Sequence, residues 1–121
     1  MNRPEQELQR EVVRLLRMVS DKRRWTAIER ANRKTLGGIQ KAMGANEGWP
    51  DLIFILDDGR MAAIELKRPD GRGRLSEAQI AWREMAETLP MGGYAVCKNV
   101  PEVFKQLRAW QFPGAERVIT F

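Results

Sequence analysis

The chain has 121 residues, of which 43% are hydrophobic and 31% are charged, so we expect one globular domain with a single hydrophobic core. It contains no histidine and only one cysteine, Cys97. This composition excludes an internal disulfide, a cysteine-rich zinc site and every catalytic mechanism that needs a histidine. Any chemistry must therefore use carboxylates and lysines, with or without a hard metal ion.

The net charge of +5 is distributed unevenly along the chain. Residues 1–41 carry 11 Lys and Arg against 5 Asp and Glu, whereas residues 42–121 carry 10 against 11. A basic segment of this kind suggests that a polyanion contacts the first part of the chain. A solvated basic surface that maintains solubility would explain the same imbalance, and charge alone does not decide between the two.

No signal peptide or membrane-spanning helix is expected from the sequence. The N-terminal residues are polar, and the longest aliphatic and aromatic run extends only from Leu52 to Leu56. Cys97 is expected to be a small buried apolar residue, which fits a cytoplasmic location.

The first predicted element is an amphipathic helix over residues 4–19, with Pro4 in its first turn. Its apolar residues fall on one stripe: Leu8, Val12, Leu15, Leu16 and Val19. Residues 24–30 alternate as a strand would. Residues 31–48 predict a short helix, broken at Gly37-Gly38, and then a loop.

The rest of the chain predicts strands and helices in alternation. They are strands over 51–56 and 60–67, a helix from Ser76 to about Leu89, a strand over 92–98, a helix that Asn99, Pro101 and Glu102 start, and a last strand over 117–121. The two helices carry these core candidates: Ile80, Trp82, Met85, Ala86, Val103, Phe104, Leu107 and Trp110. The order predicts an α/β domain with a mixed β-sheet flanked by helices.

The turn Asp57-Asp58-Gly59 sets the register of the two strands that it joins. A three-residue loop with Gly59 in the left-handed conformation pairs residue 56 with 60, and Asp51 with Glu65. The Cβ atoms of such a pair lie about 5.5 Å apart or less. A two-residue loop at Asp58-Gly59 would instead pair Asp51 with Leu66. The three-residue loop is favoured because it places Gly59 where a positive φ is needed.

Two facing carboxylates repel each other, and a divalent cation such as Mg²⁺ would remove that penalty. Strand alternation places Lys67 on the same face as Glu65, where it could orient or deprotonate a bound water or stabilise charge on a phosphate. The structural alternative is a surface salt bridge between Glu65 and Lys67, worth about 0–1 kcal/mol. Asp51 on the same face favours the metal site.

Two further polar residues have both a structural and a functional interpretation. Glu5 falls on the buried side of the first helix, although an acid is also favourable in any first helical turn. Gln79 completes a Ser76-x-x-Gln79 capping box, and it could equally point into the acidic site.

Basic and aromatic residues suggest how nucleic acid would be held. Arg68, Arg72 and Arg74 lie in a glycine-rich loop from which guanidinium groups reach phosphates readily. Trp25 and Trp49 could stack on bases, but tryptophans in single domains are more often core residues.

The motifs resemble those of a known family. Pro50-Asp51 followed by Glu65-Leu66-Lys67 resembles the PD-(D/E)xK nuclease signature. The segments "PEQELQREVVRLLR", "NEGWPDLIFIL", "AAIELKRPDGRGRLSEAQIAW" and "GYAVCKNVPEVFKQLRAW" more closely resemble VRR-NUC domains, the virus-type replication-repair nuclease modules. This resemblance covers most of the chain and implies a restriction-endonuclease-like core.

The resemblance also implies roles for individual residues. Asp51 and Glu65 match the metal-binding acids, the Leu66 carbonyl a further metal ligand and Lys67 the catalytic lysine. The helix-one acid matches Glu5, and the motif glutamine matches Gln79, which favours its functional interpretation. The cations expected to contact DNA come from the basic loop and the basic N-terminal part of the chain rather than from the resemblance: Arg33, Lys34, Arg68, Arg72 and Arg74.

The implied activity is hydrolysis of DNA phosphodiester bonds with Mg²⁺ or Mn²⁺. Small stand-alone members resemble Holliday-junction resolvases and form homodimers, so the resemblance implies branched DNA, a second copy of the chain, and the cytoplasm of a bacterium or phage-infected cell. A DNA-structure-binding module without turnover is the alternative, and a protein–protein adaptor is a third possibility.

Overall fold

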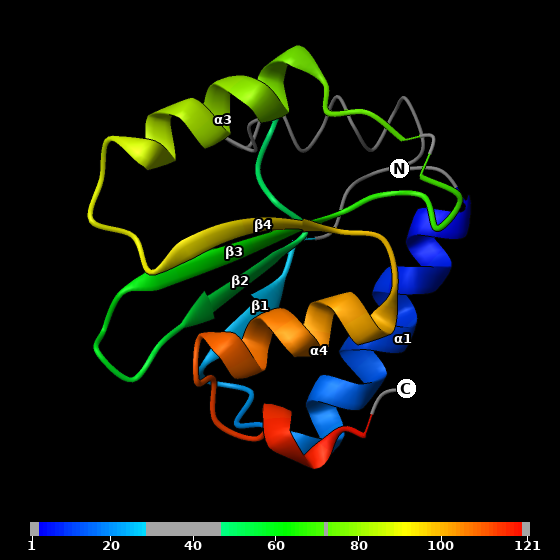
Figure 1. The fold of residues 1–121 in the computed structure, drawn as a ribbon, viewed down its shortest axis with the longest axis vertical. Helices are drawn as coiled ribbons and strands as arrows, with labels where there is room; N and C mark the ends of the chain where they lie inside the picture. The colour runs from blue at the N-terminus through cyan, green and yellow to red at the C-terminus, as the bar shows by residue number, and fades with distance from the viewer. Residues whose placement is uncertain (1–2, 29–46, 72, 120–121) are drawn as a thin grey trace.

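The computed structural model describes residues 3–28, 47–71 and 73–119, which form a four-stranded mixed sheet with helices on both faces (Figure 1). The strands are β1 (Trp25–Ala27), β2 (Leu52–Ile55), β3 (Met61–Leu66) and β4 (Gly93–Cys97), in that order across the sheet. The helices are α1 (Arg3–Val19), α3 (Glu77–Glu87), α4 (Val100–Ala109) and the short 3-10 helix η1 (Ala115–Arg117). This architecture confirms the predicted α/β class.

The sheet is mixed because only its last pair of strands is parallel. β1 pairs antiparallel with β2, and β2 pairs antiparallel with β3. β3 pairs parallel with β4, and α3 makes the crossover that a parallel pair requires.

The turn between β2 and β3 has the predicted geometry. Gly59 adopts φ 85°, its N–H donates to the Leu56 carbonyl at 2.9 Å, and the Leu56 N–H donates to the Arg60 carbonyl at 2.9 Å. Leu52 therefore lies opposite Ile64, and Ile55 opposite Met61. The predicted three-residue loop and its register are confirmed.

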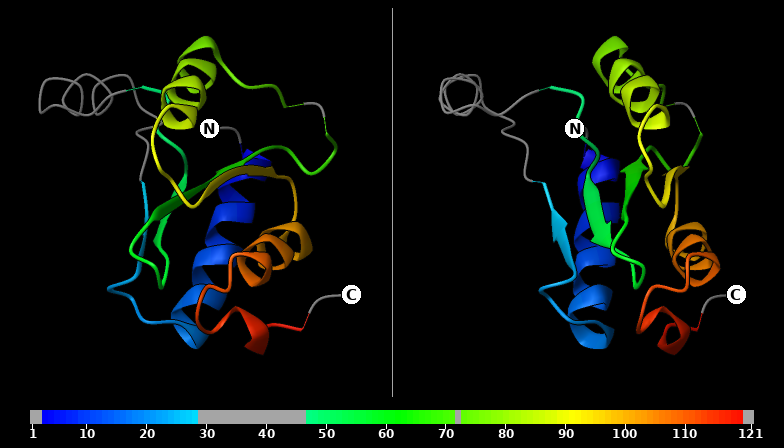
Figure 2. Two further views of the ribbon diagram at one scale, coloured as in Figure 1. Left: turned by 60° about the vertical axis from the view of Figure 1, so that its left-hand side comes forward. Right: turned by 90° about the vertical axis from the view of Figure 1, so that its left-hand side faces the viewer.

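Strand alternation divides the sheet side chains between two layers of different size. Even-numbered residues of β2 and β3 face α1 and α4, and they form the main core with Leu8, Val12, Leu16, Phe104 and their neighbours. Odd-numbered residues face α3, where the apolar cluster is smaller: Ala63, Trp82 and Ala86, with Ile53, Met91 and Tyr94 around them. Figure 2 shows α3 on one side of the sheet and α1 and α4 on the other.

The helices follow the predicted bounds closely, with one error in the core assignment. Ser76 caps α3 through the predicted capping box with Gln79, and Asn99 caps α4 by accepting from the Glu102 N–H at 2.8 Å. Trp82 is buried as predicted, but Met85 is 44% exposed, so its assignment to the core is wrong. The buried stripe of α3 runs through Gln79, Trp82 and Ala86, which leaves Met85 outside it.

The predicted last strand is also wrong over its described part, residues 117–119. Gly114 adopts φ 96° and starts η1, after which Val118 turns inward and is 9% exposed. Because the Val118 carbonyl accepts from the Arg108 guanidinium at 3.2 Å, this segment bonds to α4 rather than to a strand.

Two other expectations concern the start of the chain. The strand predicted over residues 24–30 is described only up to residue 28, and within that part it forms β1 (Trp25–Ala27). Residues 31–46 of the segment predicted as a short helix and a loop lie outside the described residues. Within the described ranges, no helix is both long and apolar enough to cross a membrane.

Candidate active site

Two acidic side chains face each other where β2 begins and β3 ends. Continuing the observed register by one residue places Asp51 opposite Glu65. Asp51 is 0% exposed and Glu65 is 2% exposed, although acidic residues are almost never so buried unless they are paired. The Asp51 Oδ2 atom accepts a hydrogen bond from the Leu66 backbone N–H at 2.7 Å, which fixes this carboxylate against β3.

Gln79 connects the second acid to the lysine. Its Nε2 atom donates to Glu65 Oε1 at 2.8 Å, and its Oε1 atom accepts from Lys67 Nζ at 3.0 Å. The same Oε1 atom accepts from the Ser76 backbone N–H at 2.8 Å, so the capping box is present as well. The structural and functional interpretations of Gln79 are therefore compatible, since one side chain makes both sets of contacts.

Lys67 lies at the rim of this arrangement. Its side chain is 12% exposed and its Nζ atom lies 3.9 Å from Glu65 Oε1. Its backbone N–H donates to the Cys97 carbonyl at 2.9 Å, which extends the β3–β4 pairing past the end of β3. The exposed surface alternative predicted for the Glu65–Lys67 pair does not hold, because both side chains are largely buried.

Glu5 reaches the same end of the sheet from the first turn of α1, and it is 7% exposed. A Cβ atom added at Gly73 would lie 3.2 Å from Glu5 Oε1 and 3.2 Å from Lys67 Cδ. The carboxylate and the lysine stem thus approach the same glycine, and a larger residue there would press on both.

The donor set fits a divalent cation only in part. In residues 3–28, 47–71 and 73–119, no three Asp, Glu, Cys or His side chains form a group that could hold a metal ion. Asp51 and Glu65 nevertheless supply facing carboxylates from adjacent strands, and Leu66 supplies a backbone carbonyl beside them. Hard oxygen donors of this kind suit Mg²⁺, which commonly binds to one or two protein carboxylates and keeps several waters.

One residue that supports the site was not singled out from the sequence for this role. The Gln9 side chain donates to the carbonyls of Ile28 and Asp51, at 3.4 Å each, and so ties α1 to the start of β2. The signal for it was its position one turn after Glu5 on the same helix.

The basic loop is only partly described. Arg68 forms an ion pair with Asp70 at 2.8 Å, and Arg74 is exposed. Arg33, Lys34 and Arg72 lie outside the described residues.

Three aromatic rings pack together on the α3 face of the sheet. The Trp49 and Trp82 ring centroids lie 5.5 Å apart, and those of Trp82 and Tyr94 lie 5.9 Å apart. Trp49 is 36% exposed, so it is the member of this cluster nearest to solvent.

Cys97 is not a nucleophile in this site. Burial, with a smaller contribution from the Glu102 carboxylate, raises the pKa of its thiol to about 12. The thiolate, which is the reactive form, is therefore negligible near neutral pH.

A mixed sheet whose central hairpin carries two facing acids and a lysine two residues after the second acid is an α/β domain of the PD-(D/E)xK type. Residues 3–100 match the VRR-NUC domain, and the chain belongs to this nuclease family. A solved structure described as a "VRR_NUC domain protein" has the same fold, with a TM-score of 0.70 and 22% identity over 94% of this chain and 93% of that chain. A search of curated proteins found no match.

Proposed function

We propose that this protein is a metal-dependent endonuclease that hydrolyses phosphodiester bonds in branched DNA such as Holliday junctions. The observation that carries the proposal is the continuous set of hydrogen bonds from Glu65 through Gln79 to Lys67, with Asp51 opposite Glu65. A protein that only binds DNA needs no buried pair of facing acids.

Asp51, Glu65 and the Leu66 carbonyl would hold Mg²⁺ or Mn²⁺, and Glu5 would act on it through water. When bound, the metal would polarise the phosphate and lower the pKa of a water molecule. The Asp51 carboxylate is already oriented by the Leu66 N–H, so little reorganisation is needed for binding.

Lys67 would act on the attacking water and on the phosphate. An ammonium group has three N–H donors, and the Gln79 bond uses one of them, which leaves donors for a phosphate oxygen or for the water. The water oxygen would form a bond to phosphorus as the bond from phosphorus to the O3′ oxygen breaks. The water loses a proton and the O3′ oxygen gains one, so the products are a 5′-phosphate and a 3′-hydroxyl. Gln79 would position both Lys67 and Glu65 for this step.

Branched DNA is supported by the resemblance to small stand-alone VRR-NUC members. A four-way junction has two equivalent strands to cut, so a homodimer with two-fold symmetry would fit it. Backbone contacts would come from the basic loop and the basic N-terminal part: Arg68, Arg72, Arg74, Arg33 and Lys34.

The decisive experiment compares cleavage of labelled Holliday junction, flap and linear duplex in Mn²⁺ and in EDTA. Wild type should cut only with the metal, and Lys67→Ala should bind DNA but not cut it. If wild type binds but never cuts, the DNA-structure-binding module replaces the nuclease.

A second measurement tests the metal without turnover. Mn²⁺ binding to the folded state should raise the thermal unfolding midpoint of wild type, because binding stabilises by RT ln(1 + [L]/Kd). Asp51→Asn removes one of the two charges and should abolish this rise. An equal rise in both proteins would contradict Asp51 as a ligand.

A further inference from the structure

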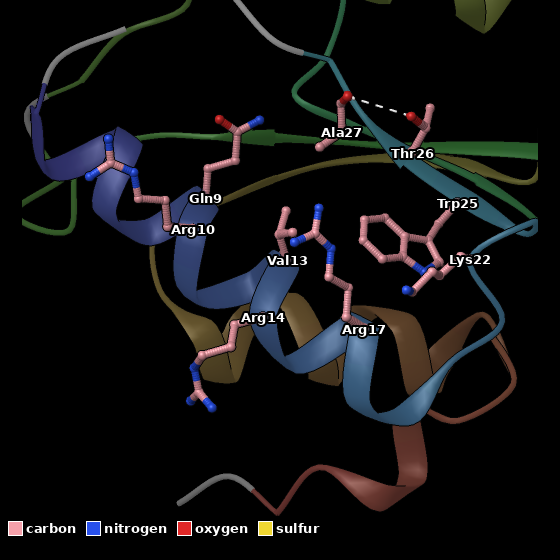
Figure 3. Close-up of a pocket in the computed structure, with 9 residues that line it drawn as sticks. All are labelled: Gln9, Arg10, Val13, Arg14, Arg17, Lys22, Trp25, Thr26 and Ala27. Carbon is pink, nitrogen blue, oxygen red and sulfur yellow. Dashed lines mark hydrogen bonds between the residues drawn. The ribbon is translucent and has the colours of Figure 1, made fainter.

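A basic groove lies between α1 and β1 (Figure 3). It encloses about 680 Å³. Four cationic side chains line it, Arg10, Arg14, Arg17 and Lys22, with Trp25 on the wall that β1 provides. No acidic side chain is among the described residues that line the groove, so it favours an anion.

Three of the four cations have no ion-pair partner among the residues that the structure describes. Arg10, Arg17 and Lys22 are exposed, and none of them forms an ion pair within the described part of the chain. Arg14 differs, because its guanidinium donates to Glu11 Oε1 at 2.6 Å, and Figure 3 shows its side chain turned away from Arg17 and Trp25. The groove therefore presents three cationic groups whose charge no described acidic side chain neutralises.

The spacing of these cations fits a polymer rather than a small anion. Arg10 and Arg17 are seven residues apart on one helix, which corresponds to about 10.5 Å along the helix axis. Successive phosphates of one DNA strand are separated along the duplex, so cations at the two ends of this length can contact different phosphates of the same strand. A single phosphate or a nucleotide would contact only one end of the row.

The groove is connected directly to the candidate active site. Gln9 lines the groove, and its side chain donates to the Asp51 carbonyl at 3.4 Å. Asp51 is the first of the two facing acids, so the groove begins one hydrogen bond away from the backbone of that acid.

We propose that the groove of Arg10, Arg17 and Lys22 binds the sugar-phosphate backbone of the DNA arm that leaves the active site past Gln9. This inference rests on the proposed nuclease function, since it supplies the path of that substrate. Contacts to phosphates carry no base information, so the groove strengthens binding without selecting sequence.

The test is the salt dependence of binding to a labelled four-way junction, measured in EDTA so that no cutting occurs. The variant Arg10→Gln/Arg17→Gln/Lys22→Gln removes three charges from the groove. The control, Lys98→Gln/Lys105→Gln/Arg117→Gln, removes three charges from exposed side chains that do not line the groove and form no ion pair within the described residues.

Each lost phosphate contact lowers the slope of log K against log salt by about 0.9. The groove variant should therefore lose about 2 to 3 units of slope and about 100-fold in affinity at 0.15 M salt. The control should lose less than half of that slope. As single changes, Arg17→Gln should lower the slope, whereas Arg14→Gln should leave it nearly unchanged because Arg14 is already paired with Glu11.

The outcomes separate this proposal from the nuclease itself. Equal slopes in the groove variant and the control overturn the groove as a DNA site, whether or not the wild type cuts in Mn²⁺. A slope lost only in the groove variant supports the site even if no cutting is found, in which case the nuclease proposal fails alone. Absence of any DNA binding by wild type overturns both.

Discussion

Replacement of Gln79 by alanine tests whether one side chain serves both the helix cap and the active site. Gln79→Ala removes the bonds to Glu65 at 2.8 Å and to Lys67 at 3.0 Å, both of which involve charged partners. Hydrogen bonds to charged groups contribute about 1.5–3 kcal/mol each. Since each 1.36 kcal/mol is tenfold in rate, loss of one such bond in the transition state predicts a fall in kcat of about 10- to 150-fold.

The control is Ser76→Ala, because it disrupts the cap without touching the acidic site. It removes the acceptor for the Gln79 N–H at 3.1 Å and should cost about 1 kcal/mol of stability. It leaves the contacts of the Gln79 side chain to Glu65 and Lys67 in place, so kcat should stay within about twofold of wild type on this reasoning.

The assay is steady-state cleavage of the preferred DNA, with kcat and KM determined separately, together with unfolding in urea. A positioning role predicts a loss in kcat that exceeds any change in KM. If Gln79→Ala and Ser76→Ala lose equal stability while both keep the wild-type kcat, Gln79 is only a helix cap and does not position Lys67 or Glu65.

Three further predictions follow from burial and backbone conformation. Asp51→Asn should keep the hydrogen bond from the Leu66 N–H and remove the charge repulsion with Glu65. In EDTA, the free energy of unfolding of this variant should therefore equal or exceed that of wild type. A loss above about 2 kcal/mol would contradict this expectation. Gly48→Ala should cost about 1–3 kcal/mol more than Gly59→Ala in thermal unfolding, because both have positive φ but only at Gly48 would a Cβ meet the Ala78 backbone; equal losses would refute this. Burial raises the pKa of the Cys97 thiol from 9.0 to about 12, so the stability that the protonated thiol contributes is complete below pH 9 and is lost at about 1.4 kcal/mol per pH unit above it. Between pH 9 and 11, the free energy of unfolding measured in urea should therefore fall more steeply in wild type than in Cys97→Ala. Parallel curves for the two proteins would contradict the raised pKa.

The central hairpin could be predicted because its information is local. Gly59 adopts positive φ in a three-residue loop, and the loop fixes which residues face each other along both strands. Counting residues back from the loop along the two strands then places Asp51 opposite Glu65. The capping residues Ser76 and Asn99 were predictable for the same reason, since a cap acts within one helical turn.

The errors arise where distant segments decide the outcome. The buried stripe of α3 includes the polar Gln79, so apolar periodicity directed attention to Met85, which is exposed. The C-terminal residues alternate like a strand, but Val118 packs into the core beside α4 instead of pairing with a sheet edge. Neither the partner of a polar core residue nor the availability of a sheet edge is encoded in a short window of sequence.

The contacts of Gln9 were likewise not predictable from a short window of sequence. A glutamine on the inner side of a helix gives no sign of its acceptors, which lie 19 and 42 residues away along the chain. Only the packed structure shows that Gln9 joins the basic groove to the first acid.

The site depends on how firmly α3 packs against the sheet, because Gln79 reaches Glu65 and Lys67 from that helix. The apolar cluster under α3 is small, whereas α1 and α4 share the main core on the opposite face. A layer with few buried apolar contacts opens locally at a lower free energy than the global transition. The capping box therefore has a consequence beyond helix stability: the Gln79 Oε1 atom that accepts from Ser76 also holds Lys67, so ordering the first turn of α3 and positioning the lysine occur together.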